Sequence, residues 1–418
     1  MRLLVRNIGQ LLTMSGPAWG EGIEPLGLVS RAALVAVEGR VVWRGAELDL
    51  PAEYSGFPAM DAQGAVVMPG LVECHTHLLF AGDRSHEFEL RCLGASYERI
   101  AEAGGGILNT MKATRSASKA ELVGLGVERL GRFLGYGVTT VEAKTGYGLE
   151  RETEFRMLEA ARELNSHSEF EVVSTFLAAH TVPPEFKANR GEYVRLVCQE
   201  WIPEVARLGL AEFVDVFSEA GAFTLAETEQ VFQSARAAGL RLKIHSEQLT
   251  HSGATRLGAS YGCVSADHLE FIDEEDAQAL AASSTIAVLL PGATAFLGKK
   301  NYAPAHLLRK HGVTVAVSTD FNPGSSHTMN MWLMGTLGCA YYGMTPAQML
   351  NAMTRGAALA LCREDLGTLD SGSQADFVLL RHGDWNRALY EFGENPVASV
   401  FKRGRPVVVE NSQQPLTL

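Results

Sequence analysis

Residues 66–77 read VVMPGLVECHTH, a nearly continuous apolar run that ends in two histidines separated by one residue. Such a run predicts a strand of a parallel sheet, because parallel strands are buried on both faces. Residues i and i+2 of a strand face the same side, so His75 and His77 can direct both imidazoles at one ion. The stretch therefore predicts a buried strand with a metal site at its carboxyl end.

Further short apolar segments follow along the chain. They are GVTTVEAK (137–144), EVVSTFLAAH (171–180), FVDVFSE (213–219), RLKIHSE (241–247), CVSADHL (263–269), TIAVLLPG (285–292) and VTVAVSTD (313–320). The spacers, such as LVGLGVERLGRFLGYG and LAETEQVFQSARAAG, have the apolar period of amphipathic helices. Eight such units predict an α/β fold, a (β/α)8 TIM-type barrel. A doubly wound open sheet is the alternative, but no Gly-x-Gly-x-x-Gly turn follows the first strand.

Both ends of the chain have another pattern. Short β-like runs broken by Gly and Pro fill the first sixty or so residues, and ADFVLLR and ASVFKRGRPVVVE lie near the end. Alternating strands with turn residues at both ends suggest one small module. We therefore predict a composite β-sandwich domain from residues 1–68 plus 362–418, and a barrel from residues 69–361.

Composition narrows the function classes. The net charge of −12 argues against nucleic acid and anionic membranes as partners. The six cysteines form no C-x-x-C pair, and the first residues lack the apolar core of a signal peptide. We expect a cytoplasmic protein that acts on a small molecule, without nucleic acid or membrane partners. A homodimer is the expected oligomer for a soluble enzyme of this size.

Candidate metal ligands or acid–base groups stand at the ends of several predicted strands, where barrel enzymes carry their chemistry. The fifth strand ends at His245, the sixth at Asp267-His268 and the eighth at Asp320. Imidazole plus carboxylate suits zinc or iron. A second ion needs a bridging ligand at the end of the fourth strand, which ends at Glu219 with no lysine in reach. We predict one divalent metal ion, with Glu219 and Lys144 in structural or supporting roles.

Around these residues the chain resembles the amidohydrolase superfamily, whose first-strand signature is matched by PGLVECHTHLLFAG (69–82). More specific stretches are similar to the imidazolonepropionase family. They are GDRSHEFELRCLGASYERIAEAGGGILNT, KTGYGL, FLAAHTVPPEFK, KIHSEQL, SADHLE and STDFNPGSS, in the family's order between about residues 69 and 330.

The resemblance implies hydrolysis of 4-imidazolone-5-propanoate to N-formimino-L-glutamate in histidine degradation, by opening a ring amide C–N bond. It implies that zinc or iron is held by His75, His77, His245 and Asp320. It also implies that Arg84 binds the substrate's carboxylate tail, for which a guanidinium fork is well suited. Further substrate-contacting positions are matched by Tyr97, Tyr147, His180, Asn322, Gly324 and Ser325. We expect the loop 322–325 to turn its amide groups toward the pocket.

One departure affects the mechanism. Related deaminases, and some members of the family, carry a glutamate three residues after the histidine of the fifth strand, where this chain has Gln248. Glu247 cannot replace it, because adjacent side chains on extended backbone point apart. We therefore assign proton transfer to Asp320, aided by His268, and substrate hydrogen bonding to Gln248. His268 or His180 would donate a hydrogen bond to the developing oxyanion.

Other functions fit parts of this pattern. A deaminase of a nucleobase-like ring shares the barrel and the H-x-H start, but usually has the glutamate that is missing here. A hydrolase of another small cyclic amide with an acidic tail would use the same residues. A metal-free scaffold on this fold predicts broken ligands, whereas every expected ligand is present.

Overall fold

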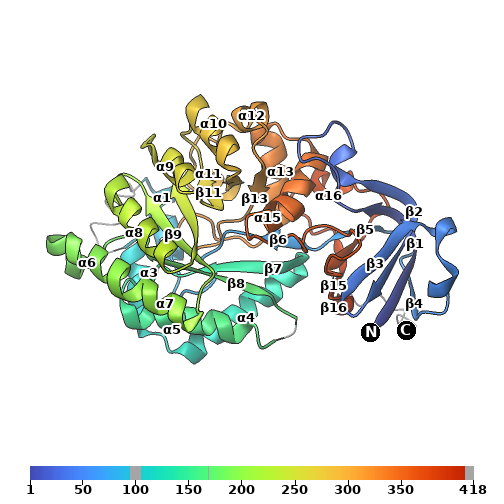
Figure 1. The fold of residues 1–418 in the computed structure, drawn as a ribbon, viewed down its shortest axis with the longest axis horizontal. Coiled ribbons are helices and arrows are strands. Elements are labelled where there is room, and N and C mark those ends of the chain that lie inside the picture. Colours follow the sequence, from blue (N-terminus) through green and yellow to red (C-terminus); the bar gives the residue numbers. More distant parts are fainter. Residues whose placement is uncertain (95–104, 168, 410–418) are drawn as a thin grey trace.

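The strands of this protein form two separate sheets. The computed structural model describes residues 1–94, 105–167 and 169–409, and within this part of the chain each sheet has eight strands (Figure 1). One sheet is the parallel barrel, and the other is a mixed sheet assembled from both ends of the chain. The predicted (β/α)8 barrel with a small β-domain from both termini is confirmed; the domain expected as a β-sandwich contains one mixed sheet in the described residues.

Each barrel strand pairs in parallel with the next strand along the chain. The strands are β6 (Leu71–Glu73), β7 (Val138–Lys144), β8 (Val172–Ala179), β9 (Phe213–Ser218), β10 (Arg241–Ser246), β11 (Ser265–His268), β12 (Ile286–Leu289) and β13 (Val315–Val317). The two ends of the sheet meet just beyond β6 and β13, where Thr76 and Phe321 form a parallel bridge. The amide of His77 donates to the carbonyl of Phe321 at 2.9 Å. This bridge closes the barrel directly beside the H-x-H motif.

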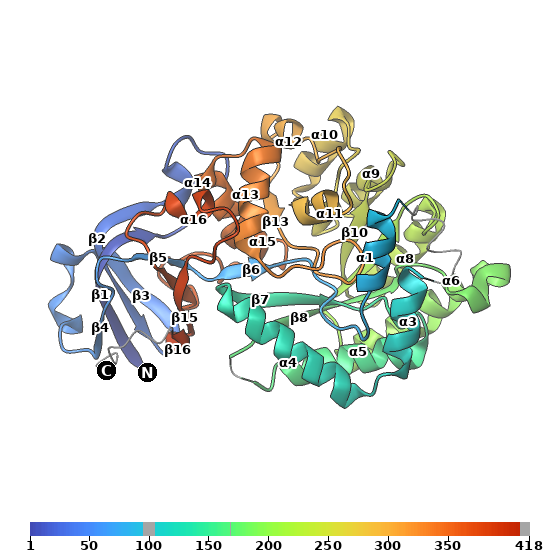
Figure 2. The ribbon, with the colours of Figure 1, turned by 180° about the vertical axis from the view of Figure 1, so that it is seen from behind.

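Helices surround the barrel (Figures 1 and 2). They are α1 (Ser85–Cys92), α3 (Ile107–Ser116), α4 (Lys119–Gly135), α5 (Arg151–Leu164), α6 (Arg190–Leu196), α7 (Ile202–Leu208), α8 (Leu225–Ala237), α9 (Ala254–Ser260), α10 (Glu274–Ser283), α11 (Pro291–Phe296), α12 (Ala305–Lys310), α13 (Met331–Tyr342), α14 (Pro346–Asn351), α15 (Ala357–Leu359) and α16 (Arg387–Tyr390). Capping boxes at Ser118 and Thr224 begin the two amphipathic helices expected from the sequence, α4 and α8.

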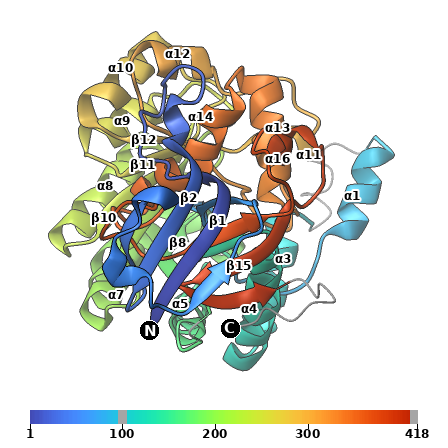
Figure 3. The ribbon, with the colours of Figure 1, turned by 90° about the vertical axis from the view of Figure 1, so that its right-hand side faces the viewer.

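The mixed sheet lies beside the barrel (Figure 1) and faces the viewer in Figure 3, with the N-terminus at its lower edge. Its strands are β1 (Arg2–Leu12), β2 (Leu28–Val37), β3 (Arg40–Ala46), β4 (Ala59–Asp61), β5 (Val66–Pro69), β14 (Phe377–Leu380), β15 (Val397–Lys402) and β16 (Arg405–Val409). The N-terminal and C-terminal strands join where β5 pairs with β14. A separate apolar cluster, which includes Val5, Leu34 and Phe401, forms the core of this sheet.

The sequence run 66–75 predicted one strand, but the structure divides it between the two sheets. β5 belongs to the mixed sheet and β6 begins the barrel, with Gly70 between them. A β-carbon on Gly70 would lie 2.4 Å from side-chain atoms of Thr139 in β7. Glycine therefore lets the chain pass closely over β7 as it leaves one sheet and enters the other.

A buried ion-pair cluster connects the barrel to the mixed sheet. Glu171 lies just before β8, and its Oε2 is 2.7 Å from Nζ of Lys402 in β15. Glu171 also forms an ion pair with Arg363. Lys402 pairs with Asp376 at 2.6 Å as well. Burial raises the pKa of the Glu171 carboxyl, but Lys402 and then Arg363 outweigh burial and hold that pKa below its ordinary value. The cluster fixes the start of β8 against the module.

Candidate active site

Three histidines and one aspartate meet at the carboxyl ends of the barrel strands. His75 and His77 directly follow β6, His245 lies in β10 and Asp320 follows β13. One ring nitrogen from each histidine lies within 4.8 Å of the other two. Asp320 Oδ1 is 3.5 Å from His75 Nε2 and 3.8 Å from His77 Nε2. The residues predicted as metal ligands are therefore brought together.

The donor atoms of this cluster suit a divalent cation. All four side chains are buried, and the Nε2 atoms of His75 and His245 have no hydrogen-bond partner among the described residues. Buried polar atoms are normally satisfied, so such nitrogens point to a bound group. Three imidazole nitrogens and a carboxylate oxygen form a ligand set typical of zinc or iron.

Two buried carboxylates lie next to the Nδ1 atoms of His75 and His245. Asp267 Oδ2 lies 2.6 Å from Nδ1 of His75, and Asp215 Oδ2 lies 3.1 Å from Nδ1 of His245. A histidine that donates its Nδ1 proton to a carboxylate keeps the lone pair of Nε2 for a metal and holds a fixed ring orientation. The hydrogen bond to Asp267 therefore orients His75 to present Nε2 to the cluster. Asp215 lies at ion-pair distance from His245, whose two ring nitrogens have no hydrogen-bond partner among the described residues.

The barrel interior beneath these carboxylates is charged. Alternate residues of β7 turn Glu142 and Lys144 inward, and Lys243 of β10 joins them, all with side chains that are 0% exposed. Lys144 pairs with Glu142 and Asp215, and Lys243 pairs with Glu142. Burial acts to lower the pKa of Lys144, but the three nearby carboxylates outweigh burial and raise it. Lys144 is thus a charged group inside the barrel.

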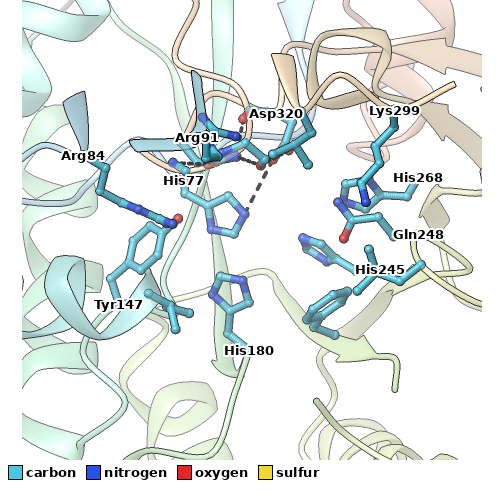
Figure 4. A pocket seen from close by; sticks show the side chains of 17 residues that line it. His77, Arg84, Arg91, Tyr147, His180, His245, Gln248, His268, Lys299 and Asp320 are labelled. Atoms are coloured by element: carbon cyan, nitrogen blue, oxygen red, sulfur yellow. Dashed lines mark hydrogen bonds and ion pairs between the residues drawn. The ribbon is translucent and has the colours of Figure 1, made fainter. Parts of the chain in front are cut away.

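A cavity of about 480 Å³ opens over the histidines (Figure 4). Its walls include most residues predicted from the sequence: His77, Arg84, Tyr147, His180, His245, Gln248, His268, Asp320, Asn322, Gly324 and Ser325. His75 lies buried beside His77 and His245, and Tyr97 lies outside the described residues. Arg84 and Tyr147 lie on one side of the cavity in Figure 4, and Gln248, His268 and Lys299 lie on the other.

Arg84 is held at its side of the cavity by two contacts. Its Nε donates to Oε2 of Glu87 at 2.7 Å, and Oε1 of Glu87 accepts from the amide of Gly106 at 2.9 Å. The side chain is 9% exposed and packs against Gly324. The end of the guanidinium is therefore presented to the cavity in a fixed place.

His180 presents an acceptor to the cavity. Its Nδ1 lies 3.0 Å from the carbonyl of Gly146, which accepts only, so this nitrogen carries the proton. Burial is the main cause that lowers the pKa of His180 to about 3, so the ring is neutral at pH 7. The second nitrogen then holds a lone pair. Of the two histidines expected to donate to an oxyanion, the geometry favours His268 over His180.

Two site residues have positive φ angles, which residues other than glycine rarely adopt. His268, at the end of β11, has φ +84° and Asp320 has φ +54°. Strained residues of this kind cluster at active sites. Burial acts to lower the pKa of His268, but Glu270, whose Oε1 lies 3.7 Å from its Nδ1, and Asp320 outweigh burial and raise it. His268 is therefore biased toward the protonated, donating form.

The loop after β13 differs from the expectation. The amides of Gly324 and Ser325 do not point into the pocket but donate to Oδ1 of Asn322, at 2.7 and 2.8 Å. The side chain of Asn322 thus closes an Asx-type turn on its own backbone. Its Nδ2 donates to the carbonyl of Asp320, and the hydroxyl of Ser325 donates to Oδ2 of Asp320 at 3.1 Å. The loop orients Asp320.

The glutamates near Gln248 make their hydrogen bonds away from the predicted metal ligands. Glu247 accepts from the amides of residues 252–255. Glu219 accepts from the amides of Leu249 and Thr250, so it fixes the loop after β10 rather than orienting a ligand. Gln248 itself lines the cavity.

Sequence reasoning missed Glu87, Asp215 and Lys299. A signal for Glu87 was present, since an acid three residues after Arg84 faces it at the start of a helix. Asp215 stands alone among apolar residues in FVDVFS, and a charge buried in a strand needs a partner. Lys299 follows α11 on the cavity rim and gave no such signal.

Comparisons with known proteins agree with this geometry. The chain matches the amidohydrolase family over residues 66–407. Imidazolonepropionases from Shewanella putrefaciens and Shewanella baltica are each 46% identical over 385 residues, covering 92% of this chain and 94% of each relative.

Solved structures of lower identity share the fold. The 5-methylcytosine deaminase from Klebsiella pneumoniae is 17% identical, with a TM-score of 0.75 and 99% of each chain covered. An adenosine deaminase from Xanthomonas campestris with bound zinc is also 17% identical, with a TM-score of 0.72, covering 98% of this chain and 93% of that one.

Proposed function

The chain belongs to the amidohydrolase family and, within it, to the imidazolonepropionases, and on that premise we propose which of its residues perform ring-opening hydrolysis of 4-imidazolone-5-propanoate. The product is N-formimino-L-glutamate. The cluster of His75, His77, His245 and Asp320 in a buried site is the observation that carries the proposal. A divalent cation held there would lower the pKa of a bound water molecule to roughly 7 and so would supply a nucleophile at neutral pH.

Asp320 and His268 have different roles in the reaction, proton transfer and hydrogen-bond donation. Asp320 Oδ1 faces the histidines, while its Oδ2 is fixed by the hydroxyl of Ser325. Asp320 accepts the proton of the attacking water and gives it to the ring nitrogen as the C–N bond breaks. His268 donates a hydrogen bond to the carbonyl oxygen of the ring amide as that oxygen becomes negative, and such a contact contributes several kcal/mol.

The opposite side of the cavity orients the substrate. Arg84 binds the propanoate carboxylate through the two terminal nitrogens that its contact with Glu87 leaves for the cavity. His180 accepts from a ring N–H, since its outer nitrogen holds a lone pair. Tyr147 packs between His77, His180 and Phe80 and forms a wall of the cavity. Gln248 completes the polar lining near the metal ligands.

The ligand set accepts zinc or iron, and we propose zinc as the first ion to test. An adenosine deaminase of the same fold holds zinc, which supports that choice. We further propose that the enzyme is a homodimer, which its mass in solution would test. Among the described residues, the structure contains no helix long and apolar enough to cross a bilayer.

The test is consumption of freshly made 4-imidazolone-5-propanoate, followed by ultraviolet absorbance against an enzyme-free control. We expect turnover that disappears on chelation and returns with Zn²⁺ or Fe²⁺. In Arg84→Ala we expect kcat/KM to fall at least about 30-fold, since losing a charged hydrogen-bonded partner costs about 2–5 kcal/mol. Turnover by the chelated protein would contradict the metal site. Absence of turnover from protein shown to contain metal would contradict the substrate.

A further inference from the structure

The ammonium group of Lys144 lies beneath the metal ligands at a junction of carboxylates. Its Nζ is 2.7 Å from Oδ2 of Asp215, 3.0 Å from Oε2 of Glu142 and 3.6 Å from Oδ2 of Asp267. The side chain is 0% exposed and rises from the end of β7, on a different strand from any metal ligand. The lysine therefore connects three strands of the barrel.

Two of these contacts use the same oxygen atoms that support the histidines. Oδ2 of Asp215 also lies 3.1 Å from Nδ1 of His245. Oδ2 of Asp267 also lies 2.6 Å from Nδ1 of His75. Each carboxylate thus shares one oxygen between an imidazole and the same ammonium. A carboxylate that turned away from Lys144 would also turn away from its histidine.

We propose that Lys144 is a positioning residue for the metal site: it holds Asp215 and Asp267 in place, so that His245 and His75 present their Nε2 atoms to one ion. The proposal deepens the proposed function and rests on it. Groups that orient metal-binding histidines typically change metal affinity by about 10- to 100-fold when they are removed.

A second effect acts in the opposite direction. The positive charge of Lys144 repels a divalent cation, so removing it favours metal binding by Coulomb's law. Lys243 separates the two effects. It is also 0% exposed, and its Nζ lies 2.8 Å from Oε1 of Glu142 and 3.3 Å from the carbonyl of Cys74. Among the described ion pairs Lys243 reaches neither Asp215 nor Asp267, so it matches Lys144 in charge and burial but not in the contacts.

The experiment compares the Zn²⁺ affinity of Lys144→Met with that of Lys243→Met in the full chain, by competition with a chelator. We expect Lys144→Met to bind Zn²⁺ at least about tenfold more weakly than Lys243→Met. The visible spectrum of the Co²⁺-loaded protein gives a second measurement. Its bands should change in Lys144→Met and keep the parent form in Lys243→Met. Equal or tighter Zn²⁺ binding by Lys144→Met, with unchanged Co²⁺ bands, would overturn the proposal.

Folding is checked on each metal-free variant by circular dichroism and thermal unfolding. If Lys144→Met does not fold, Lys144→Gln and Lys243→Gln give the same comparison, because glutamine keeps N–H donors and lacks the charge and the reach. A parent protein that binds no Zn²⁺ or Co²⁺ would contradict the proposed function. A parent that binds metal, with Lys144 variants that bind it as well as their Lys243 matches, would contradict the role of Lys144 alone.

Discussion

Gly324 lies so close to Arg84 that a β-carbon at this position would be 2.3 Å from Nη1 of the guanidinium. The two residues come from opposite ends of the barrel sequence and meet at the cavity wall. The missing side chain of Gly324 is thus what leaves room for the group that we expect to bind the substrate carboxylate.

Gly324→Ala should displace the guanidinium without unfolding the protein, because the end of an arginine side chain can move. We expect KM to rise about tenfold, equivalent to roughly 1.4 kcal/mol, with a much smaller change in kcat. Steady-state kinetics measure both. Gly131→Ala is the matched control, because a β-carbon on Gly131 in α4 meets nothing within 4 Å. An unchanged KM in Gly324→Ala would count against carboxylate binding by Arg84.

Glu87→Gln tests the contact that holds Arg84 from the other side. Glutamine removes the charge that attracts Nε of Arg84 but keeps an accepting oxygen, so we expect KM to rise about threefold to tenfold, equivalent to roughly 0.7–1.4 kcal/mol. Glu89→Gln on the same helix, with a side chain that is 70% exposed, should leave KM unchanged. Equal kinetics in the two variants would show that Arg84 needs no support from Glu87.

Gln248→Glu tests the assignment of proton transfer to Asp320. We expect no rise in kcat, because Asp320 already provides the carboxylate beside the metal ligands. Gln248→Ala should raise KM about twofold to tenfold through loss of one neutral hydrogen bond. The pH profile of kcat in the three proteins is the measurement. A large rise in kcat for Gln248→Glu would show that the general base belongs at position 248 rather than at Asp320.

Acid stability should depend on Glu171. Its folded-state pKa lies below the ordinary value, so its contribution to stability is present above the unfolded pKa and is lost as the pH falls through the folded pKa. We expect Glu171→Gln to lose about 2 kcal/mol at pH 7, and the difference from the parent to shrink below about pH 4. Urea unfolding at both pH values measures it, with exposed Glu169→Gln as the control. A difference that is independent of pH would contradict this role.

The strand ends carried most of what the sequence could predict. His75, His77, His245 and Asp320 stand at or just beyond buried parallel strands, and the barrel brings such ends together. Orientation was harder to predict. The loop 322–325 suggested amides facing the cavity, yet Asn322 takes them itself, because an asparagine oxygen is a nearer acceptor than any substrate.

Contacts between distant strands were beyond reach of the sequence. Nothing in the local pattern says that Asp215 and Asp267 share Lys144, since this depends on barrel register. The sequence also could not predict that residues 66–75 form two strands in different sheets, separated at Gly70. Both halves are buried, and the close approach of Gly70 to Thr139, which a local sequence pattern does not show, marks the place where the chain changes sheets.

The pairing of β5 with β14 has a consequence for biosynthesis. β5 ends at Pro69 and its partner begins at Phe377, so the whole barrel is synthesised before that edge of β5 can be covered. At about 5–20 residues per second, the wait lasts roughly 15–60 s. Throughout it, the nascent chain exposes an apolar strand edge of the kind that chaperones protect from aggregation.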